Sequence, residues 1–265
     1  MIYRGLIMTF LRRFFDGSSA FSNFEKYETA HIFVFYVLAA AVMLMIIFKD
    51  KITPKMDRTI KVGATALAMA SELGWHIWNY LNNDDFVGHL IYLDLCAITL
   101  ILAFVFNLSR KSSTVRKVFP LIYFWSFGAL TAILFPELSY GPDKFRFYHF
   151  FWVHSYIVLT ALYGAIVDKH RIDIKDYWKM LKTLISMGIV VGTVDRLFDK
   201  NYMFLSGPAE IATPLDYLGD GSVYYLNLLL LSAFFLFLIY LPYWLKDVAD
   251  RRAVARMMFA EEEWV

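Results

Sequence analysis

The sequence predicts an all-α membrane protein, a polytopic bundle of seven transmembrane helices, from three observations. Hydrophobic residues make up 59% of the 265 residues and charged residues only 19%, with a mean hydropathy of +0.50. Apolar stretches long enough to cross a bilayer recur along the whole chain. Basic residues gather in alternate connecting segments, as expected for a chain that crosses a membrane repeatedly. A soluble domain of this length would carry more charge, and the length suits one bundle rather than two domains.

Residues 1–29 are predicted to form an amphipathic segment that lies at the membrane interface. An apolar run begins at Ile2, is interrupted by Arg4 and ends before Arg12 and Arg13. The run is too short to span a bilayer, and phenylalanines beside the arginines favour an interfacial helix. A disordered tail is the alternative. No small-residue cleavage site directly follows the run, so no signal peptide is predicted.

Seven stretches within residues 30–245 have the length and apolar character of membrane spans. They cover residues 30–49, 60–81, 87–107, 118–136, 147–168, 180–198 and 222–245. The second and sixth are the most polar. The longest connection, 199–221, contains several glycines and prolines and is predicted to be an ordered, irregular loop.

The distribution of lysine and arginine predicts the orientation. The loops after the first, third and fifth spans and the tail 246–265 carry most of the 26 basic residues. Because positive loops stay in the cytoplasm, the tail is predicted to be cytoplasmic and the N-terminus outside. The expected location is the cell membrane, as a multi-pass protein.

Several polar residues fall inside these spans, where polar groups are costly and mark partners or functional sites. With the predicted orientation they lie in the outer half of the membrane, and the inner half is expected to hold almost nothing polar. The sequence therefore predicts a polar chamber that is open to the outer side. Its members are Glu72, His76, Asn79, Asp94, Cys96, His154, Asp195 and Arg196.

The spacing of these residues leaves alternatives open. Glu72 and His76 are four apart and share a helix face, either as a proton-handling wall or as a structural pair. If residues 87–107 are helical, Asp94 and Cys96 are about 200° apart and face opposite ways, so Asp94 would meet a neighbour such as the Asp195 region. Arg196 could simply extend to the interface.

Cys96 and His154 form the most specific pair. A lone buried cysteine usually behaves as a small hydrophobic residue, but a nearby histidine that takes its proton would make it a nucleophile. His149, five residues earlier, is expected at the interface and off the His154 face. The single cysteine excludes an internal disulfide. No metal-binding, nucleotide-binding or serine-hydrolase motif occurs, so neither a metal nor another cofactor is predicted, and nothing suggests nucleic-acid binding.

Three stretches together resemble a known family. They are residues 134–141 (LFPELSYG), residues 145–154 (FRFYHFFWVH), and residues 201–205 (NYMFL) with 213–219 (TPLDYLG). The chain is similar to the bacterial YwaF-type integral membrane family, over roughly residues 30–245. A eukaryotic transmembrane acyltransferase belongs to the same group, and androgen-regulated lipid hydrolases resemble it more distantly. The resemblance implies acyl transfer on lipids, with Cys96 and His154 in the positions of the proposed catalytic pair.

The leading hypothesis is therefore a lipid acyltransferase or hydrolase with Cys96 as nucleophile and His154 as base. The partner would be a membrane phospholipid or lysophospholipid, and the oligomeric state is open. Asn79, Trp78 and Tyr140 are possible donors to the oxyanion. A proton-coupled transporter and a non-catalytic lipid-binding protein are the alternatives. The remaining polar residues of the chamber, together with Tyr140, are predicted to contact the substrate.

Overall fold

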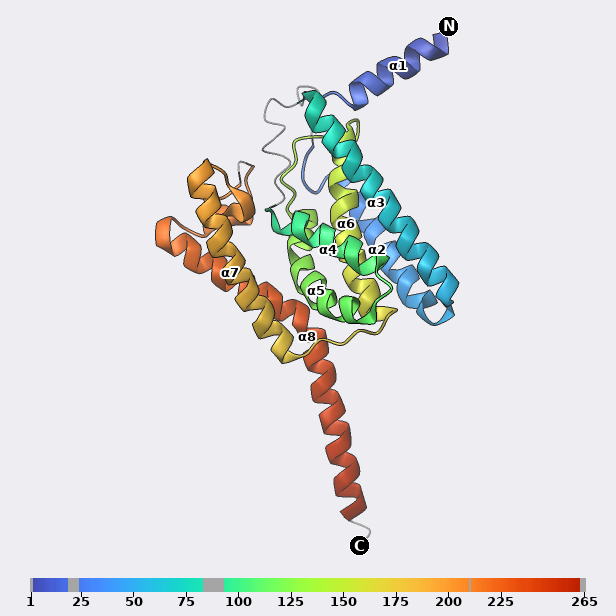
Figure 1. Ribbon diagram of the computed structural model, residues 1–265, viewed down its shortest axis with the longest axis vertical. Helices are drawn as coiled ribbons and strands as arrows, with labels where there is room; N and C mark the ends of the chain where they lie inside the picture. Colours follow the sequence, from blue (N-terminus) through green and yellow to red (C-terminus); the bar gives the residue numbers. More distant parts are fainter. Residues whose placement is uncertain (1, 19–23, 83–92, 210, 263–265) are drawn as a thin grey trace.

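The computed structural model describes residues 2–18, 24–82, 93–209 and 211–262, and these residues form helices without any β-strand. Figure 1 shows their arrangement. The α-helices are α1 (Ile2–Phe14), α2 (Thr29–Phe48), α3 (Pro54–Asn82), α4 (Leu95–Leu108), α5 (Ser112–Leu134), α6 (Phe145–Ile166), α7 (Ile174–Phe198) and α8 (Gly221–Glu262). Short 3-10 helices are η1 (Lys49–Lys51), η3 (Tyr202–Phe204) and η4 (Pro214–Tyr217).

Each of the seven predicted spans overlaps a helix, but their lengths differ from the prediction. Four helices, α2, α5, α6 and α8, are long and apolar enough to cross a membrane. The third predicted span, 87–107, is shorter than expected in its described part, because α4 begins at Leu95 and has 14 residues. Residues 87–92 lie outside the described residues. Seven crossings and their orientation remain a prediction.

Helices α5 and α6 form the centre of the bundle (Figure 1). More than half of the most apolar window of each is buried, against 6% for α2 and 11% for α8. Helix α5 packs against α4, α6, α7 and α8, whereas α6 also contacts α2 and α3. The poorly covered faces of α2 and α8 are the surfaces expected to contact lipid. The site residues on α4 and α6 therefore lie on or beside the most buried pair of helices.

Helix α8 extends far beyond the other helices (Figure 1). It has 42 residues, so it is about 60 Å long, roughly twice the thickness of the hydrocarbon core. The predicted boundary between the last span and the tail at 245/246 falls inside this continuous helix. Arg251 and Arg252 are exposed on its projecting part.

The N-terminal segment contains the predicted helix, and the turn after it is bound to the bundle. The backbone N–H of Gly17 donates to Asn82 Oδ1 at 2.9 Å, and its carbonyl accepts from the Tyr140 hydroxyl. Asp16 pairs with Lys144 at 3.3 Å. Bonds from the Ser18 hydroxyl and backbone N–H hold the pKa of Asp16 below its ordinary value. The turn after α1 thus contacts the end of the bundle opposite to the projecting part of α8, whereas α1 itself points away from the bundle (Figure 1).

Candidate functional site

Cys96 lies in the first turn of α4 and is half-buried. A Cβ added at Gly128 of α5 would lie 3.5 Å from its Sγ and 3.2 Å from Leu95 Cδ2, so Gly128 makes room for this turn. The turn has no side-chain cap, and the first backbone bond of the helix runs from Ile98 N to Asp94 O at 3.0 Å. The sulfur therefore lies beside backbone N–H groups that no helical carbonyl accepts.

His154 lies two turns into α6 and is also half-buried. Its Nδ1 is 2.7 Å from the carbonyl oxygen of Phe150, which can only accept, so Nδ1 carries the hydrogen. In the neutral ring Nε2 then has a free lone pair. His154 does not hydrogen-bond to Cys96. Its environment nonetheless fixes the tautomer that a base at Nε2 requires.

The sequence prediction that Asp94 and Cys96 face opposite ways on one helix is wrong. Asp94 precedes α4 and has extended backbone angles, φ −67° and ψ 141°, so helical rotation does not relate the two residues. Its Oδ1 accepts from Met203 N at 3.2 Å, next to the bond from Tyr202 N to Asp195 Oδ1 at 3.0 Å. This contact agrees with the expectation that Asp94 meets the Asp195 region.

Asp195 is 1% exposed at the end of α7. Its second carboxylate oxygen, Oδ2, is buried without a hydrogen-bond partner in the described part of the chain. The loop it supports contains two consecutive non-glycine residues with left-handed backbone angles, Met203 at φ 56° and Phe204 at φ 59°. Asp94 and Asp195 therefore hold a strained turn against the start of α4.

Glu72 belongs to a second group, between α3 and α6, which we call the α3–α6 cluster and define as Glu72, Trp75, Arg146 and His149. His149 Nε2 is 3.0 Å from Glu72 Oε2, and Arg146 Nη1 is 2.8 Å from His149 Nδ1. The guanidinium carbon of Arg146 lies 3.9 Å from the Trp75 ring centroid, and the His149 ring stacks on Trp75 at 5.1 Å. Glu72 on α3 is thus bonded to a residue of another helix, His149 on α6.

The remaining predicted residues differ in position. Asn79 is fully buried on α3, and His76 is half-buried one turn before it. Tyr140 lies between α5 and α6, where its ring meets Trp78 edge-on at 5.6 Å. Arg196 is exposed on α7 and makes no contact with either group. The structure therefore divides the predicted chamber into an α3–α6 cluster and a group on α4 and α7.

His149 and Arg146 are the residues that sequence reasoning missed. His149 was expected at the interface, but it is 5% exposed because the N-terminal segment and the loop before α6 cover this end of the helix. Phe14 packs on Phe145 at 6.2 Å and Phe15 at 5.2 Å, in the first turn of α6. The three-residue spacing of Arg146 and His149 was the available signal, since it puts both on one helix face.

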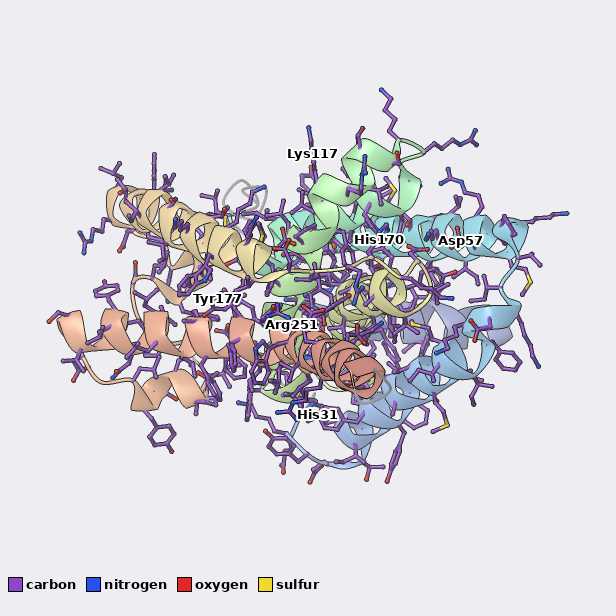
Figure 2. The ribbon with its side chains drawn as sticks, turned by 90° about the horizontal axis from the view of Figure 1, so that it is seen from below. His31, Asp57, Lys117, His170, Tyr177 and Arg251 are labelled. Carbon is purple, nitrogen blue, oxygen red and sulfur yellow. The ribbon has the colours of Figure 1, made fainter. Side chains whose placement is uncertain are left out.

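The expectation of an almost apolar inner half is wrong. A buried hydrogen-bonded network joins three helices there: Tyr156 meets Thr65 at 2.8 Å and accepts from Asn107 at 3.0 Å. Below it, Lys61 pairs with Asp57 at 2.9 Å and with Asp168 at 2.8 Å. Figure 2 shows Asp57 near His170 at this end. The sequence prediction did not include this network, because threonine, asparagine and tyrosine were not treated as costly residues within an apolar span.

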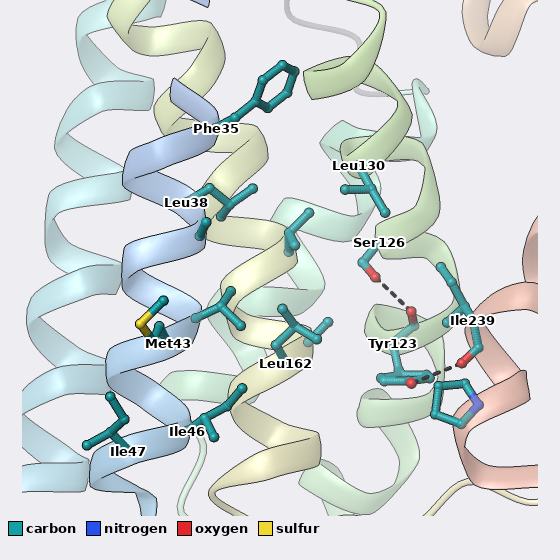
Figure 3. A pocket seen from close by; sticks show the side chains of 15 residues that line it. Phe35, Leu38, Met43, Ile46, Ile47, Tyr123, Ser126, Leu130, Leu162 and Ile239 are labelled. Atoms are coloured by element: carbon teal, nitrogen blue, oxygen red, sulfur yellow. Dashed lines mark hydrogen bonds between the residues drawn. The ribbon is translucent and has the colours of Figure 1, made fainter. Parts of the chain in front are cut away.

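An apolar groove of about 690 Å³ lies on another face of the bundle (Figure 3). Side chains from α2, α5, α6 and α8 line it. Its polar members bond to backbone carbonyls: Ser126 to that of Tyr123, and the Tyr123 hydroxyl to that of Ile239. Ser126 and Leu130 line the groove while Gly128, between them, faces Cys96, so groove and cysteine lie on opposite faces of α5.

Among the described residues, no group of three or more histidine, cysteine, aspartate or glutamate side chains is placed to hold a metal ion. A family model described as the TMEM164 family matches residues 21–240 of the chain. No curated protein and no solved structure matches it.

Proposed function

Because the chain belongs to the TMEM164 family of transmembrane proteins, we propose that it is a membrane-embedded acyltransferase that moves acyl chains between phospholipids. Cys96 is the nucleophile of this proposal and His154 its base. One observation carries it: Cys96 sits in a helical turn without a side-chain cap, beside backbone N–H groups for which the described residues supply no acceptor. The YwaF-type resemblance supports the same pair of residues.

The helix dipole stabilises the thiolate of Cys96, whereas burial and the neighbouring Asp94 carboxylate oppose it. A thiol in the first turn of a helix lies at the positive end of the helix dipole, which stabilises negative charge. Asp94 precedes the turn, and its carboxylate is held by Met203 N instead of capping the first N–H groups. The dipole and the uncapped donors thus remain available to the sulfur and to the carbonyl that it attacks.

The N–H groups of Leu95, Cys96 and Ala97 are suited to an oxyanion hole. They precede the first intrahelical bond, which Ile98 N makes. Unsatisfied N–H groups inside a membrane protein are costly, so a bound oxygen would relieve them. Such donors stabilise the charge on a tetrahedral intermediate. They are better placed for Cys96 than Asn79, Trp78 or Tyr140, of which Tyr140 already donates to Gly17 O.

The reaction follows in two balanced halves. His154 Nε2 takes the Cys96 proton, the thiolate adds to a phospholipid ester carbonyl, and the acyl C–O bond breaks. The leaving lysolipid oxygen takes the proton back from His154, which leaves an acyl-thioester on Cys96. His154 then takes the proton of a lysolipid hydroxyl, whose oxygen attacks the thioester; the released thiolate recovers the proton. With water as acceptor the same steps are hydrolysis.

The two side chains do not hydrogen-bond to each other, and catalytic hydrogen bonds commonly tighten only in the substrate complex. The test is direct, since Cys96 is the only cysteine in the chain. Purified protein incubated with phospholipid and lysophospholipid should carry an acyl adduct on Cys96 by mass spectrometry and exchange labelled chains.

Matched variants distinguish acyl transfer by Cys96 and His154 from the alternative functions. Cys96→Ala should abolish adduct and exchange, and His154→Gln should slow exchange by about 10²–10⁴-fold. Ser155→Ala, next to His154 in α6, should leave exchange unchanged. A folded Cys96→Ala protein that still exchanges chains would refute the mechanism. Lipid that co-purifies unaltered with every variant would favour a non-catalytic lipid-binding protein.

A proton-coupled transporter is the second candidate, and one observation favours it. Two polar groups lie along the α3–α6 interface: the Glu72–His149 pair and the inner network on Thr65 and Tyr156. About 10 Å of α3 separates Thr65 from Glu72, and the fully buried Ala68 lies in this interval. Proton-driven flux that needs Glu72 and survives Cys96→Ala would select this function.

A further inference from the structure

Arg146 has an unusual set of contacts for an arginine in the first turn of a membrane helix. Its only hydrogen bond among the described residues goes from Nη1 to His149 Nδ1, at 2.8 Å, and it forms no ion pair with any of their carboxylates. A guanidinium carries several N–H donors in a planar fork, so most of its donors are unused. The side chain is partly exposed, which leaves these donors accessible.

The rest of the α3–α6 cluster holds Arg146 in place. His149 Nδ1 accepts from Arg146, so the ring hydrogen is on Nε2 and is donated to Glu72 at 3.0 Å. A neutral imidazole therefore separates the guanidinium from the carboxylate. Trp75 supports the guanidinium plane at 3.9 Å. The arginine is ordered without being neutralised by a direct partner.

We infer that Arg146 binds the phosphodiester of the phospholipid substrate. This inference deepens the proposed function, on which it rests, by assigning a headgroup site above the reacting ester. A planar fork with free N–H donors is the arrangement that binds a phosphate through two parallel bonds. The uncapped N-terminus of α6, which begins at Phe145, adds further donors and a favourable dipole.

The position of Arg146 relative to His154 suits one lipid molecule. Eight residues of α6 separate them, about 12 Å along the axis. The Phe150 ring bridges the interval, 5.5 Å from the guanidinium carbon and 4.4 Å from the His154 ring. A lipid whose phosphate meets Arg146 would extend its glycerol esters along Phe150 toward His154, in the direction that the acyl-transfer mechanism requires.

The surrounding charges restrict the kind of phosphate. Glu72 and Glu137 both lie within electrostatic range of Arg146. A phosphodiester carries one negative charge and balances the guanidinium, whereas a phosphomonoester brings additional charge that these carboxylates would repel. The site therefore prefers phosphodiester lipids to phosphatidic acid and to neutral diacylglycerol.

The test measures binding and needs no turnover. In the full-length Cys96→Ala protein, native mass spectrometry would quantify binding of phosphatidylcholine, phosphatidic acid and diacylglycerol with the same acyl chains. Adding Arg146→Gln should weaken phosphatidylcholine binding by about tenfold or more and leave diacylglycerol unchanged. Arg146→Lys keeps the charge without the fork and should fall between. Arg12→Gln, an exposed arginine of α1, is the charge-matched control and should bind within about twofold of the parent.

The outcomes separate the two proposals. If Arg146→Gln weakens the binding of phosphatidylcholine and diacylglycerol equally, or of neither, the phosphate site is overturned. Melting curves identify variants that are merely unfolded, and Arg146→Lys then carries the test. Displacement of the lipid by millimolar inorganic phosphate would indicate a free-phosphate site and overturn the lipid assignment. A selective loss of phosphatidylcholine binding, in a protein whose wild type forms no acyl adduct, would refute acyl transfer and leave the headgroup site standing.

Discussion

Among the described glycines, Gly164 of α6 leaves the least room for a side chain. A Cβ at this position would lie 2.4 Å from Phe119 Cε2 and 3.2 Å from Phe106 Cζ. Phe119 is 1% exposed and its ring is held between Phe106, Tyr123 and His170, with centroids 4.9–5.8 Å away. The ring cannot swing aside, so Gly164→Ala must push α6 away from α5.

The expected magnitude follows from two opposing effects. Alanine favours a helix over glycine by about 1 kcal/mol, while overpacking a dense core costs about 1–3 kcal/mol, and a 2.4 Å approach belongs at the upper end. Gly164→Ala should therefore lower the free energy of unfolding by about 1–2 kcal/mol. Gly63→Ala in α3 and Gly188→Ala in α7 meet nothing within 4 Å, so each should raise it by about 0.5–1 kcal/mol.

Thermal unfolding of the three variants in one detergent measures the difference. Because α6 carries His154 and α5 carries Gly128, the shift should also slow formation of the Cys96 adduct, which the two control variants leave intact. A Gly164→Ala protein as stable as Gly63→Ala would refute the packing argument.

Three further predictions concern charges. Lys61→Met should cost about 3 kcal/mol at pH 7, because it leaves two carboxylates without their cation. Burial raises the pKa of Asp168 in the wild type, and Lys61 opposes that rise. Removing Lys61 should raise this pKa further, so the variant should gain more stability than the wild type as pH falls from 7; melts of both proteins across pH check this. Asp94→Asn removes a negative charge beside Cys96 and should speed its alkylation by N-ethylmaleimide several-fold; an unchanged rate would contradict the coupling. Asp16→Asn should speed tryptic cleavage of the N-terminal segment at pH 8, and equal cleavage would show that the ion pair does not hold it.

The positions of the helices could be predicted from the sequence, since apolar length and turn residues determine them locally. The N-terminal helix was predicted for a different reason, the phenylalanines beside Arg12 and Arg13, with a disordered tail as the alternative. The length of α4 was missed because apolar residues flank the start, although Asp94, a residue type favoured at helix N-caps, lies directly before Leu95. The error about Asp94 follows from it: the 200° argument assumed a helix where the backbone is extended.

The residues of the candidate site could be predicted only where the predicted depth of a polar residue in the membrane was enough to single it out. Cys96 and His154 were selected because polar groups in apolar spans stand out. His149 and Glu72 are 77 positions apart, and only the packing of α3 on α6 brings them together. Arg146 was not among the predicted site residues, because its contact with Trp75 likewise depends on the packing of α3 on α6.

The short α4 connects these observations. At 14 residues it is about 21 Å long, less than the roughly 30 Å of a hydrocarbon core. Had the helix run from residue 87 to 107, Cys96 would lie in its middle, where every backbone N–H is bonded and no oxyanion could be held. Starting at Leu95 places unbonded N–H groups beside the only cysteine, in a turn that is partly buried. The strained loop held by Asp94 and Asp195 supports this end without capping it, which leaves its donors for a lipid carbonyl.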